Sequence, residues 1–144
     1  MKPAEIRFYV DADLLGLAKV LGSLRSDVTY PGDAGAVIHK HHRPACPIVG
    51  PAMPDTEWLP LVAEHGWLVI SRDHNIRENP AERRAVLESG AKMVALAGKD
   101  AGNKWHQLEL VLRHWRRIEA IAAEAGPCIY AATYRRLTKL DLSQ

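Results

Sequence analysis

Three short apolar runs, separated by stretches with helical spacing, constrain this chain most strongly. Ile6–Val10, Trp67–Ile70 and Lys92–Ala97 are rich in β-branched and aromatic residues, as buried strands are. Leu14–Leu24 repeats leucine at helical spacing, and Pro80–Glu88 opens with a proline that suits the first turn of a helix. Strands that alternate with helices form parallel sheets through right-handed crossovers. We therefore predict an α/β fold with three layers, α/β/α, around a mostly parallel central sheet.

The remaining segments complete this organisation. Residues 31–54 contain five prolines and three glycines, which predicts a long loop with room for one short element around Ala36–Lys40. The other predicted elements are a short strand at Val28–Tyr30, a helix capped by Asp55 and ending at His65, one long helix over Asn103–Ala125, and an edge strand within Cys128–Tyr134. A length of 144 residues is typical of a single domain, so we expect residues 1–144 to form one unit.

Composition narrows the class of protein. With 47% hydrophobic and 25% charged residues, the chain has the composition of a globular protein, and no apolar run approaches the roughly 20 residues of a membrane span. We see no secretion signal at the start, and two cysteines cannot form a disulfide framework, so we expect a cytoplasmic protein. The net charge of +2 has its positive excess in the C-terminal third, which permits contact with a polyanion without requiring it.

Acidic residues follow two of the predicted strands. Asp11 comes directly after the first strand with Asp13 two residues later, and Asp73 follows Ser71 at the end of the second. The carboxyl ends of parallel strands open on one side of a sheet, where the helix that starts at Asp55 also begins. Carboxylates gathered there repel one another, and a hard cation such as Mg²⁺ or Mn²⁺ relieves that repulsion. Because such ions activate water next to a phosphate, phosphodiester hydrolysis is the chemistry implied.

These segments resemble a known family. Arg7–Leu14, Asp55 with its helix, and Leu68–Asp73 look like the PIN domain, and most closely like the compact PIN-like toxins of bacterial toxin–antitoxin pairs. The resemblance covers about residues 6–98, which we take as the core, with the long helix and edge strand over 103–135 added to it. It implies a metal-dependent endoribonuclease that acts on RNA with Mg²⁺ or Mn²⁺, and a cognate antitoxin as partner.

The resemblance also assigns roles to single residues. Asp11, Asp55 and Asp73 match the family's catalytic, metal-binding acids, Asp13 matches a further acidic position, and Ser71 matches the hydroxyl that orients the last acid. The family's midchain glutamate has no convincing counterpart here. Asp33 and Glu57 are only weak substitutes for it.

Basic and aromatic residues add further hypotheses. Arg72 and Arg77 flank Asp73 and are predicted to contact the substrate, whereas three arginines of the long helix are more simply a solvated face: Arg113, Arg116 and Arg117. His39–His42 with Cys46 lack the spacing of a structural zinc site, so a flexible basic loop that touches the substrate is preferred. The four tryptophans are most simply core residues or part of a homodimer interface.

Alternatives remain for the roles of single residues and for the function of the protein. Helix capping alone would explain Asp11, Asp13 or Asp55, but explains Asp73 less well because no strong helical pattern follows it. A PIN-like scaffold that has lost activity and works through protein contacts is the main alternative function, and the missing glutamate favours it. A phosphoacceptor α/β domain is disfavoured, since its nucleophilic aspartate and its lysine are absent from interpretable positions.

Overall fold

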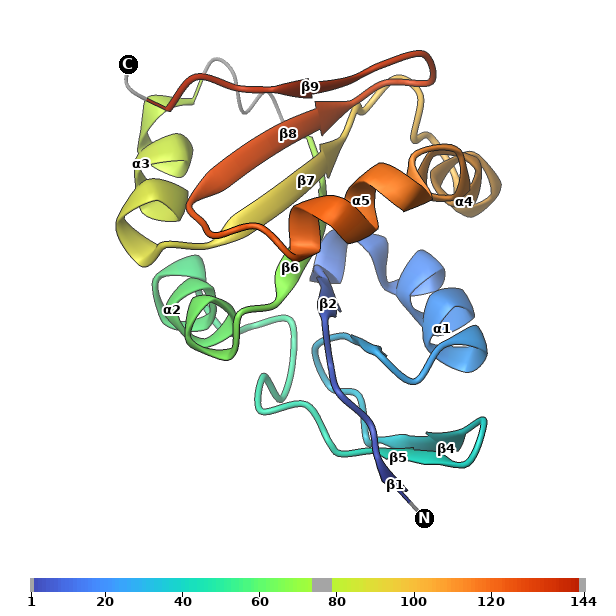
Figure 1. The fold of residues 1–144 in the computed structure, drawn as a ribbon. Helices are drawn as coiled ribbons and strands as arrows, with labels where there is room; N and C mark the ends of the chain where they lie inside the picture. The colour runs from blue at the N-terminus through green and yellow to red at the C-terminus, as the bar shows by residue number, and fades with distance from the viewer. Residues whose placement is uncertain (1, 74–78, 143–144) are drawn as a thin grey trace.

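A six-stranded sheet with the strand order β3-β2-β6-β7-β8-β9 crosses the molecule (Figure 1). The computed structural model describes residues 2–73 and 79–142. Neighbouring strands pair in parallel from β3 to β8, and β9 returns antiparallel to β8. The strands are β2 (Phe8–Val10), β3 (Val28–Thr29), β6 (Leu68–Arg72), β7 (Lys92–Leu96), β8 (Cys128–Ala132) and β9 (Leu137–Lys139). The predicted mostly parallel sheet is confirmed.

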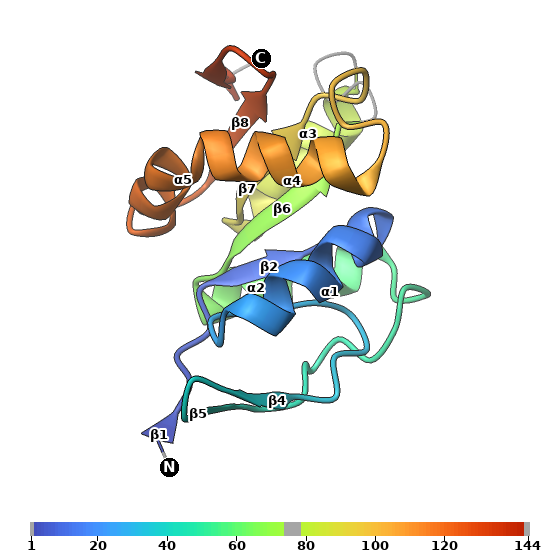
Figure 2. The ribbon, with the colours of Figure 1, turned by 90° about the vertical axis from the view of Figure 1, so that its right-hand side faces the viewer.

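Helices cover both faces of this sheet (Figures 1 and 2). One face carries α1 (Leu15–Leu24), α4 (Lys104–Arg113) and α5 (Trp115–Ala122), and the other carries α2 (Asp55–His65) and α3 (Pro80–Ser89). The pleat of β2 divides its side chains between the two layers, because successive residues of a strand point to opposite faces. Phe8 and Val10 pack with Leu17 of α1, whereas Tyr9 packs with Val62 of α2. The α/β/α architecture is therefore the predicted one.

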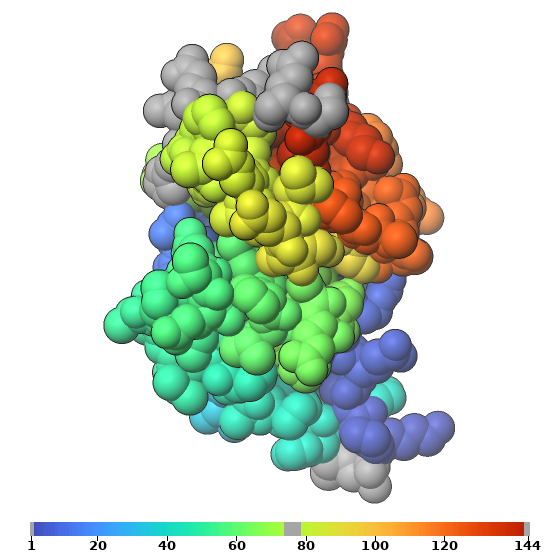
Figure 3. All heavy atoms as spheres, turned by 90° about the vertical axis from the view of Figure 1, so that its left-hand side faces the viewer, coloured from blue at the N-terminus to red at the C-terminus, as the bar shows by residue number. Residues whose placement is uncertain are grey.

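The face formed by α2 and α3 is the one seen in Figure 3, where the two helices lie side by side and the C-terminal strands lie next to α3. Each helix ends at a glycine in the left-handed region, Gly66 with φ 73° and Gly90 with φ 78°. Residues with a Cβ adopt this conformation at a cost, so glycine suits both positions. The two helices thus stop directly before β6 and β7, and the following strands enter the sheet without long connections.

A second, three-stranded sheet has the order β1-β5-β4 and lies apart from the six-stranded sheet, on the side of the N-terminus (Figure 2). It consists of β1 (Lys2–Pro3), β4 (Ala36–Ile38) and β5 (His41–Arg43). The long loop predicted for residues 31–54 therefore contains a hairpin, and His39 and Lys40 form its turn with positive φ. His41 and His42 belong to a paired strand, so the flexible basic loop preferred from the sequence is wrong for this segment.

Arg43 ties this hairpin to the main body of the protein. Its buried guanidinium donates from Nε to Asp33 Oδ2 over 2.7 Å and from Nη1 to the carbonyl oxygen of Gly22 at the end of α1 over 2.8 Å. Asp33 Oδ2 also accepts from the hydroxyl of Thr29 in β3 over 3.0 Å. The charges of Arg43 and Asp33 thus neutralise each other inside the protein, as a buried pair requires.

Two predicted helix boundaries are corrected. The helix expected over Asn103–Ala125 divides at His114, whose buried ring bonds through Nε2 to the carbonyl oxygen of Thr133 over 2.8 Å. This contact with the turn between β8 and β9 accompanies the break between α4 and α5. At α2 the cap position belongs to Pro54, and Asp55 is the first helical residue. None of the helices within residues 2–73 and 79–142 has the length and apolar character needed to cross a membrane.

Candidate active site

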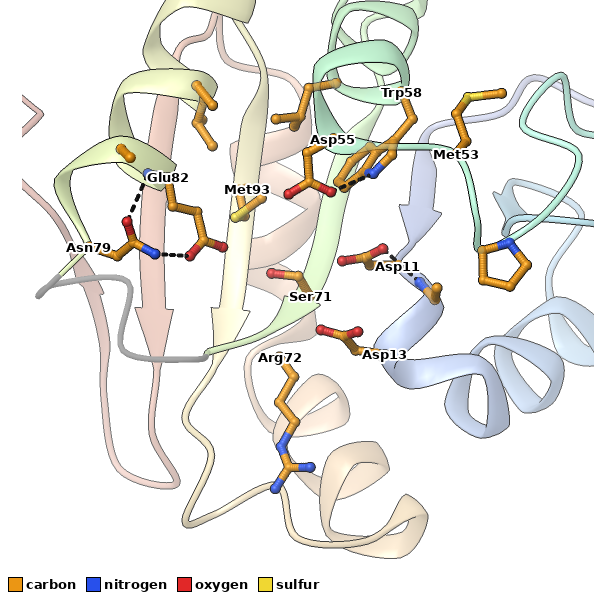
Figure 4. A pocket seen from close by; sticks show the side chains of 16 residues that line it. Asp11, Asp13, Met53, Asp55, Trp58, Ser71, Arg72, Asn79, Glu82 and Met93 are labelled. Carbon is orange, nitrogen blue, oxygen red and sulfur yellow. Dashed lines mark hydrogen bonds between the residues drawn. The ribbon is translucent and has the colours of Figure 1, made fainter.

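An acidic pocket of about 470 Å³ opens at the carboxyl ends of β2 and β6 (Figure 4). Among the residues that the structure describes, four carboxylates line it, those of Asp11, Asp13, Asp55 and Glu82, and they face the same space around Ser71. They come from separate segments: the residues after β2, the first turn of α2 and the first turn of α3. The chain therefore brings together acids that are up to 71 positions apart in the sequence. We refer to this place as the acidic pocket.

Asp11 has the most constrained carboxylate of the group. Its backbone N–H donates to the carbonyl oxygen of Ile70 over 2.9 Å, which fixes the end of β2 against β6. Its Oδ1 accepts from the N–H of Ala12 over 2.7 Å, so Asp11 caps the short 3-10 helix η1 (Ala12–Leu14). The pKa of Asp11 is raised to about 6, first by burial and then, against the opposing effect of the Ala12 hydrogen bond, by three nearby carboxylates: Asp13, Asp55 and Glu82. Ionisation at this position therefore costs free energy in the absence of a cation.

Asp55 is oriented by an aromatic residue of its own helix. The indole N–H of Trp58 donates to Asp55 Oδ1 over 2.8 Å, and Trp58 packs against Tyr9 of β2 with ring centroids 5.4 Å apart. Because Trp58 is buried in the core, this bond turns the Asp55 carboxylate toward the strand ends. Asp13, by contrast, is exposed on η1 at the mouth of the pocket.

Glu82 is the acid that sequence reasoning missed. Asn79 caps α3 by accepting from the N–H of Glu82 over 3.2 Å, and its side-chain amide donates to Glu82 Oε2 over 3.4 Å. A glutamate three residues after a helix cap is most simply interpreted as a capping residue, which hides any other role. One signal was available, because α3 follows β6 directly and its first turn must lie at the same edge of the sheet as Asp11.

The weak sequence candidates for the midchain acid lie elsewhere. Asp33 is buried in its ion pair with Arg43, and Glu57 is exposed on α2, and neither belongs to the lining of the pocket. The further carboxylate of this pocket is therefore that of Glu82 in α3, which follows β6 in the sequence.

The other predicted site residues are placed as follows. Ser71 is buried and lines the pocket, and Arg72 lines it while its Nη2 donates to the carbonyl oxygen of Gly98 over 3.3 Å. Asp73 directly follows β6, and its N–H donates to the carbonyl oxygen of Leu96 over 2.7 Å, but it is not part of the pocket lining. Its metal role stays a prediction. Arg77 falls outside the described residues.

The donor set suits a hard divalent cation. Carboxylate oxygens with room for water are the ligands that Mg²⁺ prefers, and the mutual repulsion around Asp11 is the kind that a cation relieves. Across residues 2–73 and 79–142, no three His, Cys, Asp or Glu side chains are already drawn together tightly enough to hold a metal ion. The chemistry of the pocket fits Mg²⁺ or Mn²⁺, and binding would require the carboxylates to move closer to one another.

Comparisons with known proteins identify the family of this chain. The sequence model of a family described as "PIN like domain" matches residues 6–98, the segment that contains the whole acidic pocket. A curated protein of Mycobacterium tuberculosis, named "Putative ribonuclease VapC45", is 32% identical over 89 residues, which are 60% of this chain. The match spans 62% of that relative's own length. No solved structure gives a significant match.

Proposed function

Because this chain belongs to the family of PIN-like domains, we propose that it is a metal-dependent endoribonuclease that hydrolyses RNA phosphodiester bonds. The observation that carries the proposal is the half-buried carboxylate of Asp11, which shares one open pocket with three further carboxylates. A similar protein named as a ribonuclease supports the same chemistry. We also propose, from this similarity, that the protein is the toxin of a toxin–antitoxin pair and acts in the cytoplasm. Its protein partners would be the antitoxin and a second copy of the chain.

Four residues of the pocket would hold the cation, namely Asp11, Asp13, Asp55 and Glu82, with Asp73 as the further ligand predicted from the sequence. When bound, Mg²⁺ or Mn²⁺ would supply an activated water and neutralise the charge that develops on the scissile phosphate. Trp58 and Asn79 orient the carboxylates of Asp55 and Glu82 through the hydrogen bonds described above. Such supporting bonds keep ligands in place and reduce the cost of ordering them.

Two other side chains act on the substrate in this proposal. Arg72 lines the pocket with its guanidinium directed away from the carboxylates, where Nη2 donates to the carbonyl oxygen of Gly98, and its other N–H groups would bind a phosphate of the substrate chain as it leaves the pocket. The hydroxyl of Ser71, between the carboxylates, donates a hydrogen bond to one of them or to the attacking water. Together the two side chains position the substrate and the attacking water relative to the carboxylates, and such positioning raises the reaction rate.

The test is RNA hydrolysis by the purified protein. We expect cleavage of a single-stranded RNA in Mg²⁺ or Mn²⁺, no cleavage in EDTA, and loss of cleavage in Asp11→Asn. Glu57→Gln, which removes an exposed acid from the same face, is the matched control and should cleave as the parent does. Hydrolysis that persists in EDTA, or in Asp11→Asn, would show that a different mechanism or a contaminant is responsible.

A catalytically weak scaffold is the second candidate. It is favoured by the finding that no three acids within the described residues form a tight shell. A scaffold of this kind would bind neither Mn²⁺ nor RNA tightly, so calorimetric titration with Mn²⁺ separates the two candidates independently of cleavage.

A further inference from the structure

A second hollow, of about 300 Å³, lies at the same edge of the sheet as the acidic pocket. Its five lining residues all follow strands or sit on the helix after β7: Lys99, Asp100, His106, Glu109 and Tyr134. We call it the Tyr134 hollow. Since the strands concerned are parallel, the chain segments after β7 and β8 open on the side where the residues after β2 and β6 form the acidic pocket.

Arg72 connects the two places. Its side chain lines the acidic pocket but extends away from the carboxylates (Figure 4), and its Nη2 bonds to the carbonyl oxygen of Gly98. Gly98 immediately precedes Lys99, which lines the Tyr134 hollow. A substrate chain that leaves the acidic pocket along Arg72 therefore passes the cationic side chains of Arg72 and Lys99 and reaches the hollow.

Tyr134 is exposed and yet firmly held. The residue lies in the turn between β8 and β9 and is 48% exposed. The N–H of Tyr134 donates to Asp100 Oδ2 over 2.9 Å, and the turn is closed by the N–H of Thr133 donating to the carbonyl oxygen of Arg136 over 2.8 Å. The guanidinium of Arg113 lies 4.6 Å from the centroid of the ring. A flat ligand that stacks on this ring loses little free energy in ordering it.

The polar groups around the ring are those that recognise a nucleotide. Lys99 is exposed and supplies a cation for a phosphate, whereas Glu109 is half-buried and supplies a carboxylate that accepts N–H groups. Asp100 already accepts from the backbone of Tyr134. An aromatic ring, a carboxylate acceptor and a lysine in one hollow match a base, its exocyclic amine and its phosphate.

Building on the proposed nuclease function, we propose that the Tyr134 hollow binds a nucleotide of single-stranded RNA beside the one being cleaved. The base stacks on Tyr134 and donates its exocyclic amine to Glu109. Cytosine, adenine and guanine carry such an amine and uracil does not, so this site selects against uracil.

Binding of fluorescent RNA oligomers in EDTA, followed by anisotropy, tests the stacking contact without cleavage. We expect Tyr134→Ala to weaken binding of oligo(C) about tenfold, the size of one base–aromatic stack, while Tyr134→Phe stays within about twofold of the parent. Leu24→Ala, which truncates an exposed side chain at the end of α1, is the control and should bind as the parent does. If Tyr134→Ala also binds within twofold of the parent, the stacking site is disproved.

A pair of pyrimidine oligomers tests the amine contact. The parent should bind oligo(C) about fivefold more tightly than oligo(U), within the range of one base-specific contact, and Glu109→Gln should lose this preference. Equal binding of the two oligomers by the parent would overturn the role of Glu109.

Cleavage assays separate this proposal from the nuclease proposal. Tyr134→Ala should raise KM about tenfold with kcat little changed, because the ring touches a neighbouring nucleotide rather than the reacting phosphate. If the parent cleaves RNA and Tyr134→Ala has an unchanged KM, the nuclease proposal is supported and the proposed RNA-binding role of the Tyr134 hollow is disproved. If the parent binds RNA through Tyr134 but does not cleave it in Mn²⁺, the nuclease proposal is disproved instead.

Discussion

Asp11 makes the stability of the metal-free protein depend on pH. Its pKa is about 6 in the folded protein, because of burial and nearby carboxylates, whereas in the unfolded chain it returns to about its ordinary 3.8. The folded state therefore binds the proton more tightly, so this group's contribution to stability is complete below pH 3.8 and is lost as the pH rises through 6.

We predict that Asp11→Asn raises the thermal midpoint relative to the parent at pH 7.5 in EDTA, and that this advantage shrinks as the pH falls toward 4. The asparagine lacks the charge whose burial is unfavourable, so the difference between the two proteins isolates this titration. Midpoints measured in EDTA between pH 4 and 7.5 check it. A difference that does not change with pH would show that Asp11 titrates normally.

Glu82 gives a second prediction at the level of single residues. Glu82→Gln should weaken Mn²⁺ binding by about tenfold or more, as the loss of a charged group at a metal site does, and should leave the fold intact. Glu57→Gln is the matched control, since it removes the same charge from a position outside the pocket. Calorimetric titration measures both variants. Equal weakening in both would mean that net charge, not a ligand from α3, determines the affinity.

Asp73 is the residue whose predicted role the pocket leaves open. We predict that Asp73→Asn abolishes RNA cleavage while its thermal midpoint in EDTA stays level with the parent or rises, because removing one of several like charges lowers their repulsion. Cleavage rates and midpoints are measured side by side on the two proteins. A variant that cleaves at the parent's rate would remove Asp73 from the active site.

At the scale of elements, the Arg43–Asp33 pair holds the small sheet against β3 and α1. Arg43→Met should destabilise the protein by roughly 3–5 kcal/mol, because the Asp33 charge is left buried without its partner. The double variant Asp33→Asn with Arg43→Met should recover part of this loss. Urea unfolding measures both, and a single variant as stable as the double one would mean that Asp33 is solvated or protonated in the absence of the arginine.

The elements also show what the sequence could predict. Local signals sufficed for the strand before Asp11, for α2 and for α3, since apolar runs, a proline and terminal glycines act within a few residues. The break at His114 could not be predicted, because the Thr133 carbonyl that bonds its ring lies in a turn far along the chain. Capping masked Glu82 in the same way, since its local role is sufficient to explain it.

At the scale of the whole molecule, a divalent cation should behave as a ligand of the folded state. The acids of the pocket are brought together only by the folded sheet and helices, so Mn²⁺ binds the native protein in preference to the unfolded chain. We predict that the thermal midpoint rises with Mn²⁺ concentration, with about 2.7 kcal/mol of stabilisation at one hundred times the dissociation constant. Differential scanning calorimetry checks this, with Asp11→Asn showing a smaller increment. A midpoint indifferent to Mn²⁺ in the parent would favour the scaffold.

The pairing of β2 with β6 determines when the acidic pocket can form as the chain is synthesised. β2 leaves the ribosome about sixty to seventy residues before the Ile70 carbonyl that fixes Asp11 and the first turn of α3 that carries Glu82. Parallel strands distant in sequence pair only after the segment between them has been made, so their association is slow. A nascent chain that ends before α3 therefore lacks the pocket, and on the proposed function a ribosome making this protein does not carry an active ribonuclease until α3 has emerged.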